Sequence, residues 1–131
     1  MTQLWQAAAP SGATPDQALL MRLANEAENL LAGNPLKAAE EDLKAIEGWL
    51  DQNEEQWLTW LEPLPQEQWL ALAIFFTAAE EQLANWHCGS NNPAIIIFQA
   101  LKKQGQLPDK PQMRAIKALT NNRYIPYGAV L

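Results

Sequence analysis

Residues 66–86, QEQWLALAIFFTAAEEQLANW, decide the fold of this 131-residue chain. At a helical spacing of about 100° per residue, four large apolar side chains share one face: Trp69, Leu72, Phe76 and Leu83. Further apolar side chains cover the rest of the cylinder in the first half of the segment. Because a helix that is apolar all round must be surrounded by other helices, the segment predicts the central helix of a bundle.

Residues that typically begin helices are also present before residue 66. Capping side chains at Thr14, Asn34 and Asn53 predict three helices there. The helix after Asn53 is expected to be short, because Pro63 follows it. One continuous bent helix over residues 35–61 is the alternative to a break at Asn53.

Two more helices are expected after the central segment. Asn92 and Pro93 form the start of the first, and Gly105 follows its end. The last covers residues 110–120, and the largely apolar residues 124–127 predict an extended tail across the bundle.

These elements predict an all-α fold, because the chain contains no convincing pair of strands and no internal repeat. We expect a flexible lead-in over residues 1–13 and a single helical domain over residues 14–131, with about five helices around the central one. A chain of this length suits one domain with a substantial core.

Charge is divided unequally along the chain. Residues 1–86 contain fourteen acidic and three basic side chains, a net charge of −11. Residues 87–131 contain six basic side chains and one acidic side chain, a net charge of +5. Such asymmetry bears on partners and self-association rather than on the fold.

Several classes of protein do not fit this sequence. The single cysteine, Cys88, excludes an internal disulfide framework and suits a reducing compartment. The longest mainly apolar stretch, residues 69–79, is shorter than the ~20 residues that span a bilayer, and no signal peptide is evident. We therefore expect a soluble, cytoplasmic protein without a membrane partner.

The sequence also lacks the residues of common catalytic and metal sites. Zinc needs three or four suitable ligands, and the chain offers one histidine, His87, and one cysteine. Adjacent residues such as His87 and Cys88 point apart on a helix, which does not suit a nucleophile pair. Phosphate-binding loops and serine-nucleophile motifs are absent from the sequence as well. We expect no cofactor, no metal and no catalytic residue.

Basic side chains form a stripe on the last expected helix. Lys110, Arg114 and Lys117 fall on one face at positions i, i+4 and i+7, and Arg123 follows. The stripe is either a solvated surface or a contact for an acidic protein, including the acidic half of a second copy. A helix-turn-helix contact with nucleic acid is a further alternative, which the negative net charge of the chain disfavours.

Four other side chains are candidates for special roles. Glu80 falls within the apolar stripe of the central helix, where an unpaired carboxylate is unfavourable, so we expect it to pair with Arg114, Arg123, Tyr124 or a backbone amide of the C-terminal tail. Exposure of Glu80 to solvent is the alternative. His87 lies seven residues later on nearly the same face. Trp57 and Trp60 are core residues or, if exposed, aromatic anchors for a partner.

Three functional hypotheses follow. The first is a small non-enzymatic protein that acts by protein–protein interaction or self-association. Its acidic N-terminal helices and basic C-terminal helix would be the complementary surfaces. The second is a nucleic-acid-associated regulator that uses the basic C-terminal helix. The third is a small enzyme with Glu80 and His87 in one pocket.

Overall fold

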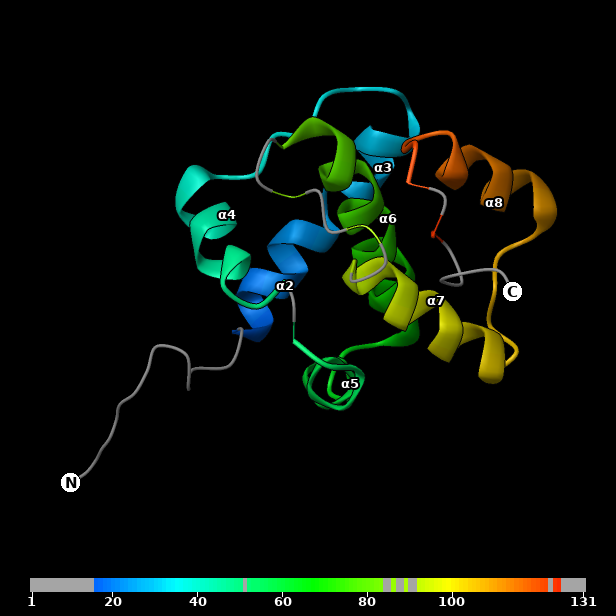
Figure 1. Cartoon of the computed structure of the whole chain (residues 1–131), viewed down its shortest axis with the longest axis horizontal. Coiled ribbons are helices and arrows are strands. Elements are labelled where there is room, and N and C mark those ends of the chain that lie inside the picture. Colours follow the sequence, from blue (N-terminus) through cyan, green and yellow to red (C-terminus); the bar gives the residue numbers. More distant parts are fainter. Residues whose placement is uncertain are drawn as a thin grey trace.

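The computed structural model describes residues 16–50, 52–83, 86, 89, 92–122 and 124–125, and these residues form helices without any strand (Figure 1). The helices are α2 (Gln17–Ala24), α3 (Ala27–Leu31), α4 (Glu40–Glu47), α5 (Glu54–Leu61), α6 (Gln66–Gln82), α7 (Pro93–Lys103) and α8 (Lys110–Lys117). The all-α prediction is confirmed.

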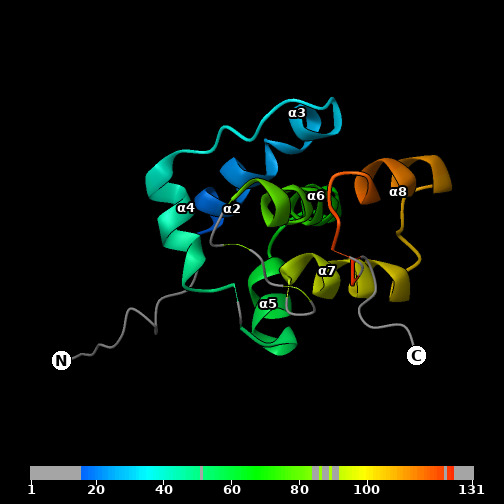
Figure 2. The same ribbon diagram turned by 45° about the horizontal axis from the view of Figure 1, so that its top comes forward.

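Helix α6 lies at the centre of the domain. Each of residues 72–80 is buried, so neighbouring elements cover this part of the helix on every side. Helices α2 and α3 pack against one side of α6, and α7 packs against the other (Figure 2). Helix α5 contacts α7, and α8 contacts α6. The prediction of one central apolar helix in a single domain is therefore confirmed, although α6 ends at Gln82 rather than near residue 86.

Four of the helices have a side-chain cap at their first turn. The oxygen acceptors belong to Asp16 for α2, Asn53 for α5, Asn92 for α7 and Asp109 for α8. Each such cap satisfies a backbone N–H that the helix itself leaves free and contributes about 1 kcal/mol. The caps at Asn53 and Asn92 are those expected from the sequence, whereas α2 is capped by Asp16 and not by Thr14 as expected.

The loop before α4 is longer than the sequence suggested. A helix was expected from residue 35, but α4 begins at Glu40. Side chains from other elements hold the loop backbone: the Leu36 N–H donates to Gln82 Oε1 at 2.7 Å, and the Lys37 N–H donates to Glu26 Oε1 at 2.8 Å. In a helix that began at residue 35 these two amide groups would lie in the first turn, where the helix itself provides no acceptor, so the tertiary bonds satisfy them without a helix start at this point.

The first expected helix is interrupted. A turn at Asn25 and Glu26 separates α2 from α3, and the chain has neither glycine nor proline at this point. The break at Asn53 is present, so α4 and α5 are separate helices and the alternative of one bent helix is wrong.

Helix α4 is joined to α2 by a two-bond ion pair. Arg22 donates from Nε to Asp42 Oδ2 and from Nη2 to Asp42 Oδ1, both at 2.9 Å. The hydrogen bonds from the Arg22 guanidinium lower the pKa of Asp42, and the same bonds raise the pKa of Arg22. Ile46 of α4 is fully buried and adds an apolar contact to this attachment.

Helices α4 and α8 lie at opposite ends of the domain, as both ribbon views show (Figures 1 and 2). The helices in the described part of the chain include none with the length and apolar character needed to cross a membrane.

Candidate functional site

Helix α8 begins at a side-chain cap and packs on the domain through Met113 and Ile116, with Leu119 just after its end also packed against the core. Asp109 Oδ1 accepts a hydrogen bond from the Gln112 N–H at 3.0 Å, and Pro111 suits the first turn. Ile116 is 0% exposed and packs into the core. This anchorage determines which side of α8 faces solvent.

The solvent side of α8 carries three basic side chains, Lys110, Arg114 and Lys117, all of them exposed. We call these three residues the basic face of α8. Ion pairs within the described residues link Arg22 to Asp42 and Lys44 to Glu40, and neither pair involves the basic face. Arg114 and Lys117 interact favourably with the carbonyl end of the helix, a surface effect of about 0.3–1 kcal/mol. Their charges nevertheless remain accessible to another molecule.

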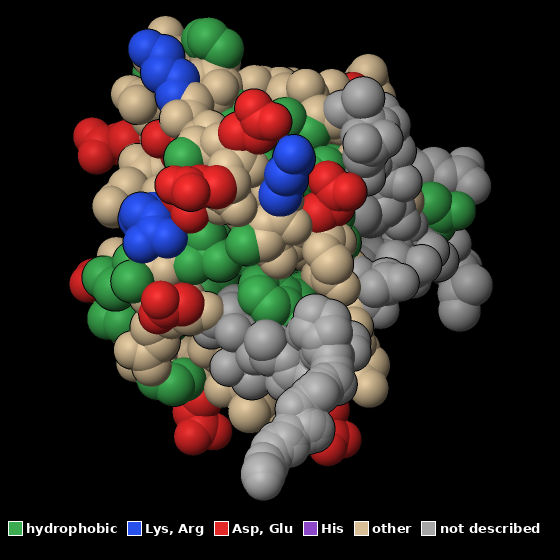
Figure 3. Space-filling model, turned by 90° about the vertical axis from the view of Figure 1, so that its left-hand side faces the viewer, with side chains coloured by type: hydrophobic (Ala, Val, Ile, Leu, Met, Phe, Trp, Pro, Cys, Tyr) green, Lys and Arg blue, Asp and Glu red, His purple; other side chains and the backbone are tan. Residues whose placement is uncertain are grey.

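Acidic side chains lie at the opposite end of the domain. Glu40, Glu41 and Glu47 of α4 are exposed, and Figure 3 shows acidic side chains distributed over this end of the molecule. Basic side chains lie among them in Figure 3, and Glu81 of α6 lies against the segment that follows α8, so acidic side chains predominate at the α4 end without being confined to it. Arg123, the fourth basic residue expected at the contact surface, lies outside the described residues.

The segment that follows α8 is tied to the end of α6. Glu81 Oε1 accepts hydrogen bonds from Thr120 Oγ1 at 3.0 Å and from the Asn121 N–H. Asn122 Nδ2 donates to the Gly89 carbonyl oxygen at 2.8 Å. These bonds hold the end of α8 against the central helix, so the basic face is presented by a fixed element.

Glu80 is 5% exposed and belongs to a buried polar cluster. Its Oε1 accepts a hydrogen bond from Asn92 Nδ2 at 2.8 Å, and its Oε2 accepts one from the Gly89 N–H at 3.4 Å. Asn92 Nδ2 also donates to the Phe76 carbonyl oxygen at 3.2 Å. Glu80 therefore helps to join the end of α6 to the start of α7, which is a structural role. His87, the other member of the suggested pocket, lies outside the described residues.

Trp57 and Trp60 are part of the core. Trp57 is 0% exposed and Trp60 is 9% exposed, and their ring centroids are 5.0 Å apart in an edge-to-face arrangement. Trp57 also contacts the Phe76 ring, at 5.4 Å, and its Nε1 donates to the Trp49 carbonyl oxygen at 3.1 Å. Because both indoles are buried, the suggestion that they are exposed anchors for a partner is wrong, and the packing alternative holds.

Sequence reasoning missed the side chains that complete the polar cluster. Asn92 was identified only as a helix cap, and the role of Asn122 was not foreseen. The geometry of the described residues brings no three histidine, cysteine, aspartate or glutamate side chains together in a way that would hold a metal ion.

Comparison with known protein families, curated proteins and solved structures finds no match for this chain.

Proposed function

We propose that this protein is a non-enzymatic binding module whose basic face on α8 binds an acidic surface of another protein. One observation carries the proposal: Lys110, Arg114 and Lys117 are exposed on one helix, and none of them forms an ion pair with a described residue. Exposed cations that pair with no described residue are available to an external partner.

The separation of charge supports the same proposal. An acidic partner is attracted by α8 and repelled by the acidic end at α4, so the charge distribution orients the approaching partner. Complementary charges of this kind raise the association rate and select the partner more than they raise affinity. The effect acts over a Debye length of about 8 Å in physiological salt, so only close charges contribute.

Nucleic acid is less well supported as the partner. The chain has a net charge of −6, and the basic face contributes three cations. Tight binding to DNA rests on neutralising several phosphates, with about 6–10 contacts in strongly salt-dependent complexes. The basic face meets only part of that requirement.

Affinity capture with charge-reversed variants tests the proposal. The tagged protein is recovered from nuclease-treated extract of its native cell beside two variants, Arg114→Glu/Lys117→Glu and Lys37→Glu/Lys44→Glu. Both variants change the net charge by the same amount, but the second alters side chains before and within α4. The proposal predicts a protein partner that the wild type and the Lys37/Lys44 variant retain and the Arg114/Lys117 variant loses.

Two further measurements distinguish self-association and nucleic-acid binding from binding to a different protein. Sedimentation velocity over a range of concentration and salt shows whether the acidic partner is a second copy of this chain, in which case the Arg114/Lys117 variant sediments as the monomer. Retardation of DNA or RNA by the wild type alone would favour the nucleic-acid hypothesis. Identical protein partners for all three forms would contradict the proposal.

A further inference from the structure

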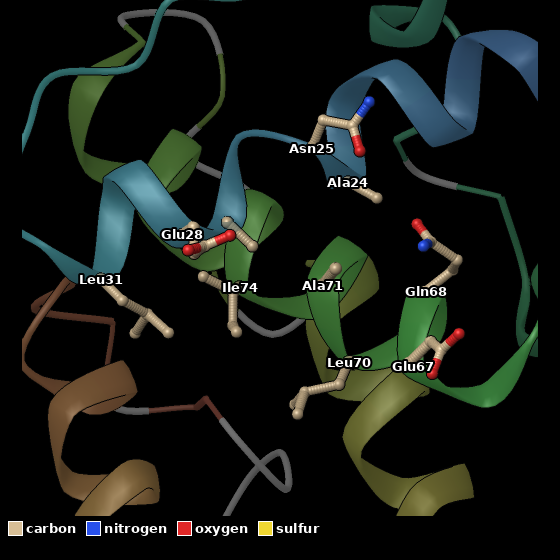
Figure 4. A pocket seen from close by; sticks show the side chains of 10 residues that line it. Ala24, Asn25, Glu28, Leu31, Glu67, Gln68, Leu70, Ala71 and Ile74 are labelled. Carbon is tan, nitrogen blue, oxygen red and sulfur yellow. The ribbon is translucent and has the colours of Figure 1, made fainter.

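A pocket of about 290 Å³ lies between the α2–α3 segment and the first half of α6 (Figure 4). All of its lining residues fall between residues 24 and 74, so it includes none of the basic face. Leu70, Ala71 and Ile74 of α6 and Leu31 of α3 supply its apolar lining. The volume is near the lower end of the range of small-molecule sites, which suits a ligand of few atoms.

The polar groups of the pocket are mainly oxygen acceptors. Glu28 and Glu67 are exposed carboxylates at the pocket, and neither forms an ion pair with a described residue. The Oε1 atom of Gln68 is buried and has no hydrogen-bond partner among the described residues. In Figure 4 the Gln68 carboxamide extends from α6 towards Ala24 and Asn25 on the other wall. Two carboxylates without an ion pair to a described residue, together with this acceptor, suit a ligand that donates hydrogen bonds and carries positive charge.

The two carboxylates lie towards different ends of the apolar lining. Glu67 is in the first turn of α6, and Ile74 is seven residues further along the same helix, a rise of about 10 Å. Glu28 of α3 lies near Ile74 in Figure 4, whereas Glu67 lies beyond Leu70. An apolar surface is thus bounded by a negative charge at each end.

We propose that this pocket binds a linear aliphatic diamine or polyamine. One ammonium group pairs with Glu28 and a second with Glu67, while the methylene chain between them contacts Leu70, Ala71 and Ile74. Exposed ion pairs are individually weak, so the expected affinity is in the millimolar range and depends on both ends binding together. This binding site is independent of the proposed function of α8.

NMR titration of the ¹⁵N-labelled full chain tests the proposal, in an amine-free buffer of low ionic strength. The probes are 1,5-diaminopentane, n-pentylamine and 1-pentanol, which share a five-carbon chain and differ in their ammonium groups. We expect shift changes concentrated in residues 24–31 and 67–74, and tighter binding of the diamine than of the monoamine by about tenfold, with no measurable binding of the alcohol.

Substitutions in the pocket show which side chains contact the diamine. Glu28→Gln is expected to remove the advantage of the diamine over the monoamine, since one charged end is lost. Glu47→Gln, an exposed carboxylate of α4, is the matched control and should leave both affinities unchanged. Ala71→Phe fills the apolar surface while keeping both carboxylates and should abolish diamine binding; a dispersed spectrum verifies that each variant is folded.

Three results would overturn the proposal. The first is an absence of shift changes in residues 24–31 and 67–74. The second is an equal loss of binding in the Glu28→Gln and Glu47→Gln variants, which would indicate general attraction to an acidic protein. The third is binding of 1-pentanol as tight as that of the diamine, which would indicate an apolar site only.

Discussion

Asn92 donates a hydrogen bond from Nδ2 to Oε1 of Glu80 at 2.8 Å, while its Oδ1 accepts from the Ala94 N–H at 2.7 Å. One carboxamide therefore caps α7 and also pairs with the buried carboxylate at the end of α6. An asparagine provides a donor and an acceptor on the same group, and this position uses both.

Replacing Asn92 with aspartate tests this double role. Asn92→Asp keeps an acceptor for the Ala94 N–H but sets a second carboxylate against Glu80. Two carboxylates in a buried site resist ionising together, so the variant should lose about 2–3 kcal/mol of unfolding free energy at neutral pH. The loss should shrink as the pH falls, because a proton taken up by the pair relieves the repulsion.

Urea unfolding at neutral and at mildly acidic pH measures this effect. Asn92→Ser is the control, since a serine hydroxyl caps the helix and introduces no charge. It still loses the hydrogen bond to Glu80, so we expect a loss of about 1–2 kcal/mol that carries no charge repulsion and depends less on pH. An Asn92→Asp variant that is equally destabilised at both pH values would argue against the contact with Glu80.

The two core tryptophans should respond differently to removal of their indole nitrogen. Trp57 Nε1 donates to the Trp49 carbonyl oxygen, whereas Trp60 Nε1 is buried and finds no hydrogen-bond partner in the described part of the chain. Trp57→Phe removes a hydrogen bond and ring volume, and should cost about 2 kcal/mol of stability. Trp60→Phe removes an unsatisfied donor, which offsets part of the lost packing.

Chemical denaturation of both phenylalanine variants gives this difference directly. The account requires a larger loss for Trp57→Phe than for Trp60→Phe. The reverse order would mean that the hydrogen bond to Trp49 contributes little to the core.

The ion pair between Arg22 and Asp42 should make stability depend on pH in the acid range. Since Arg22 lowers the pKa of Asp42 in the folded protein, its stabilising effect is complete above the unfolded value of about 3.9. The effect is then lost as the pH falls through the lower folded-state pKa. Arg22→Gln should therefore be less stable than the wild type at neutral pH and equal to it in strong acid.

Denaturation midpoints measured from neutral pH into strong acid show whether the stabilities of the wild type and Arg22→Gln become equal. Lys44→Gln serves for comparison, because Lys44 and Glu40 are 3.7 Å apart and both are highly exposed. A difference between wild type and Arg22→Gln that stays constant into strong acid would contradict the assigned pair.

Local patterns were sufficient to predict the central helix and several helix starts. Residues 72–80 are buried, as their nearly continuous apolar character requires, and Asn53 and Asn92 cap helices through short-range bonds. The start of α4 could not be predicted in this way. It depends on Gln82 and Glu26, which accept hydrogen bonds from loop amides 46 and 11 residues away in sequence.

The candidate site was predictable only where periodicity decides exposure. The spacing of Lys110, Arg114 and Lys117 placed them on one face, and all three are exposed there. The same spacing argument predicted that Glu80 is buried, but its partner comes from the start of another helix. The burial of Trp57 and Trp60 depends on Trp49 and on α6, so a pattern within their own short helix could not establish it.

Site-specific photo-crosslinking tests the central claim, that the basic face of α8 contacts an acidic protein, most directly. A benzophenone amino acid replaces Ala115, an exposed residue of α8 beside Arg114, and in a parallel sample it replaces Ala45, an exposed residue of α4. After irradiation of nuclease-treated native extract, the account predicts a discrete protein adduct at Ala115 that disappears in the Arg114→Glu/Lys117→Glu background and is not formed from Ala45. The same adduct from both positions, or no protein adduct at Ala115, would contradict it.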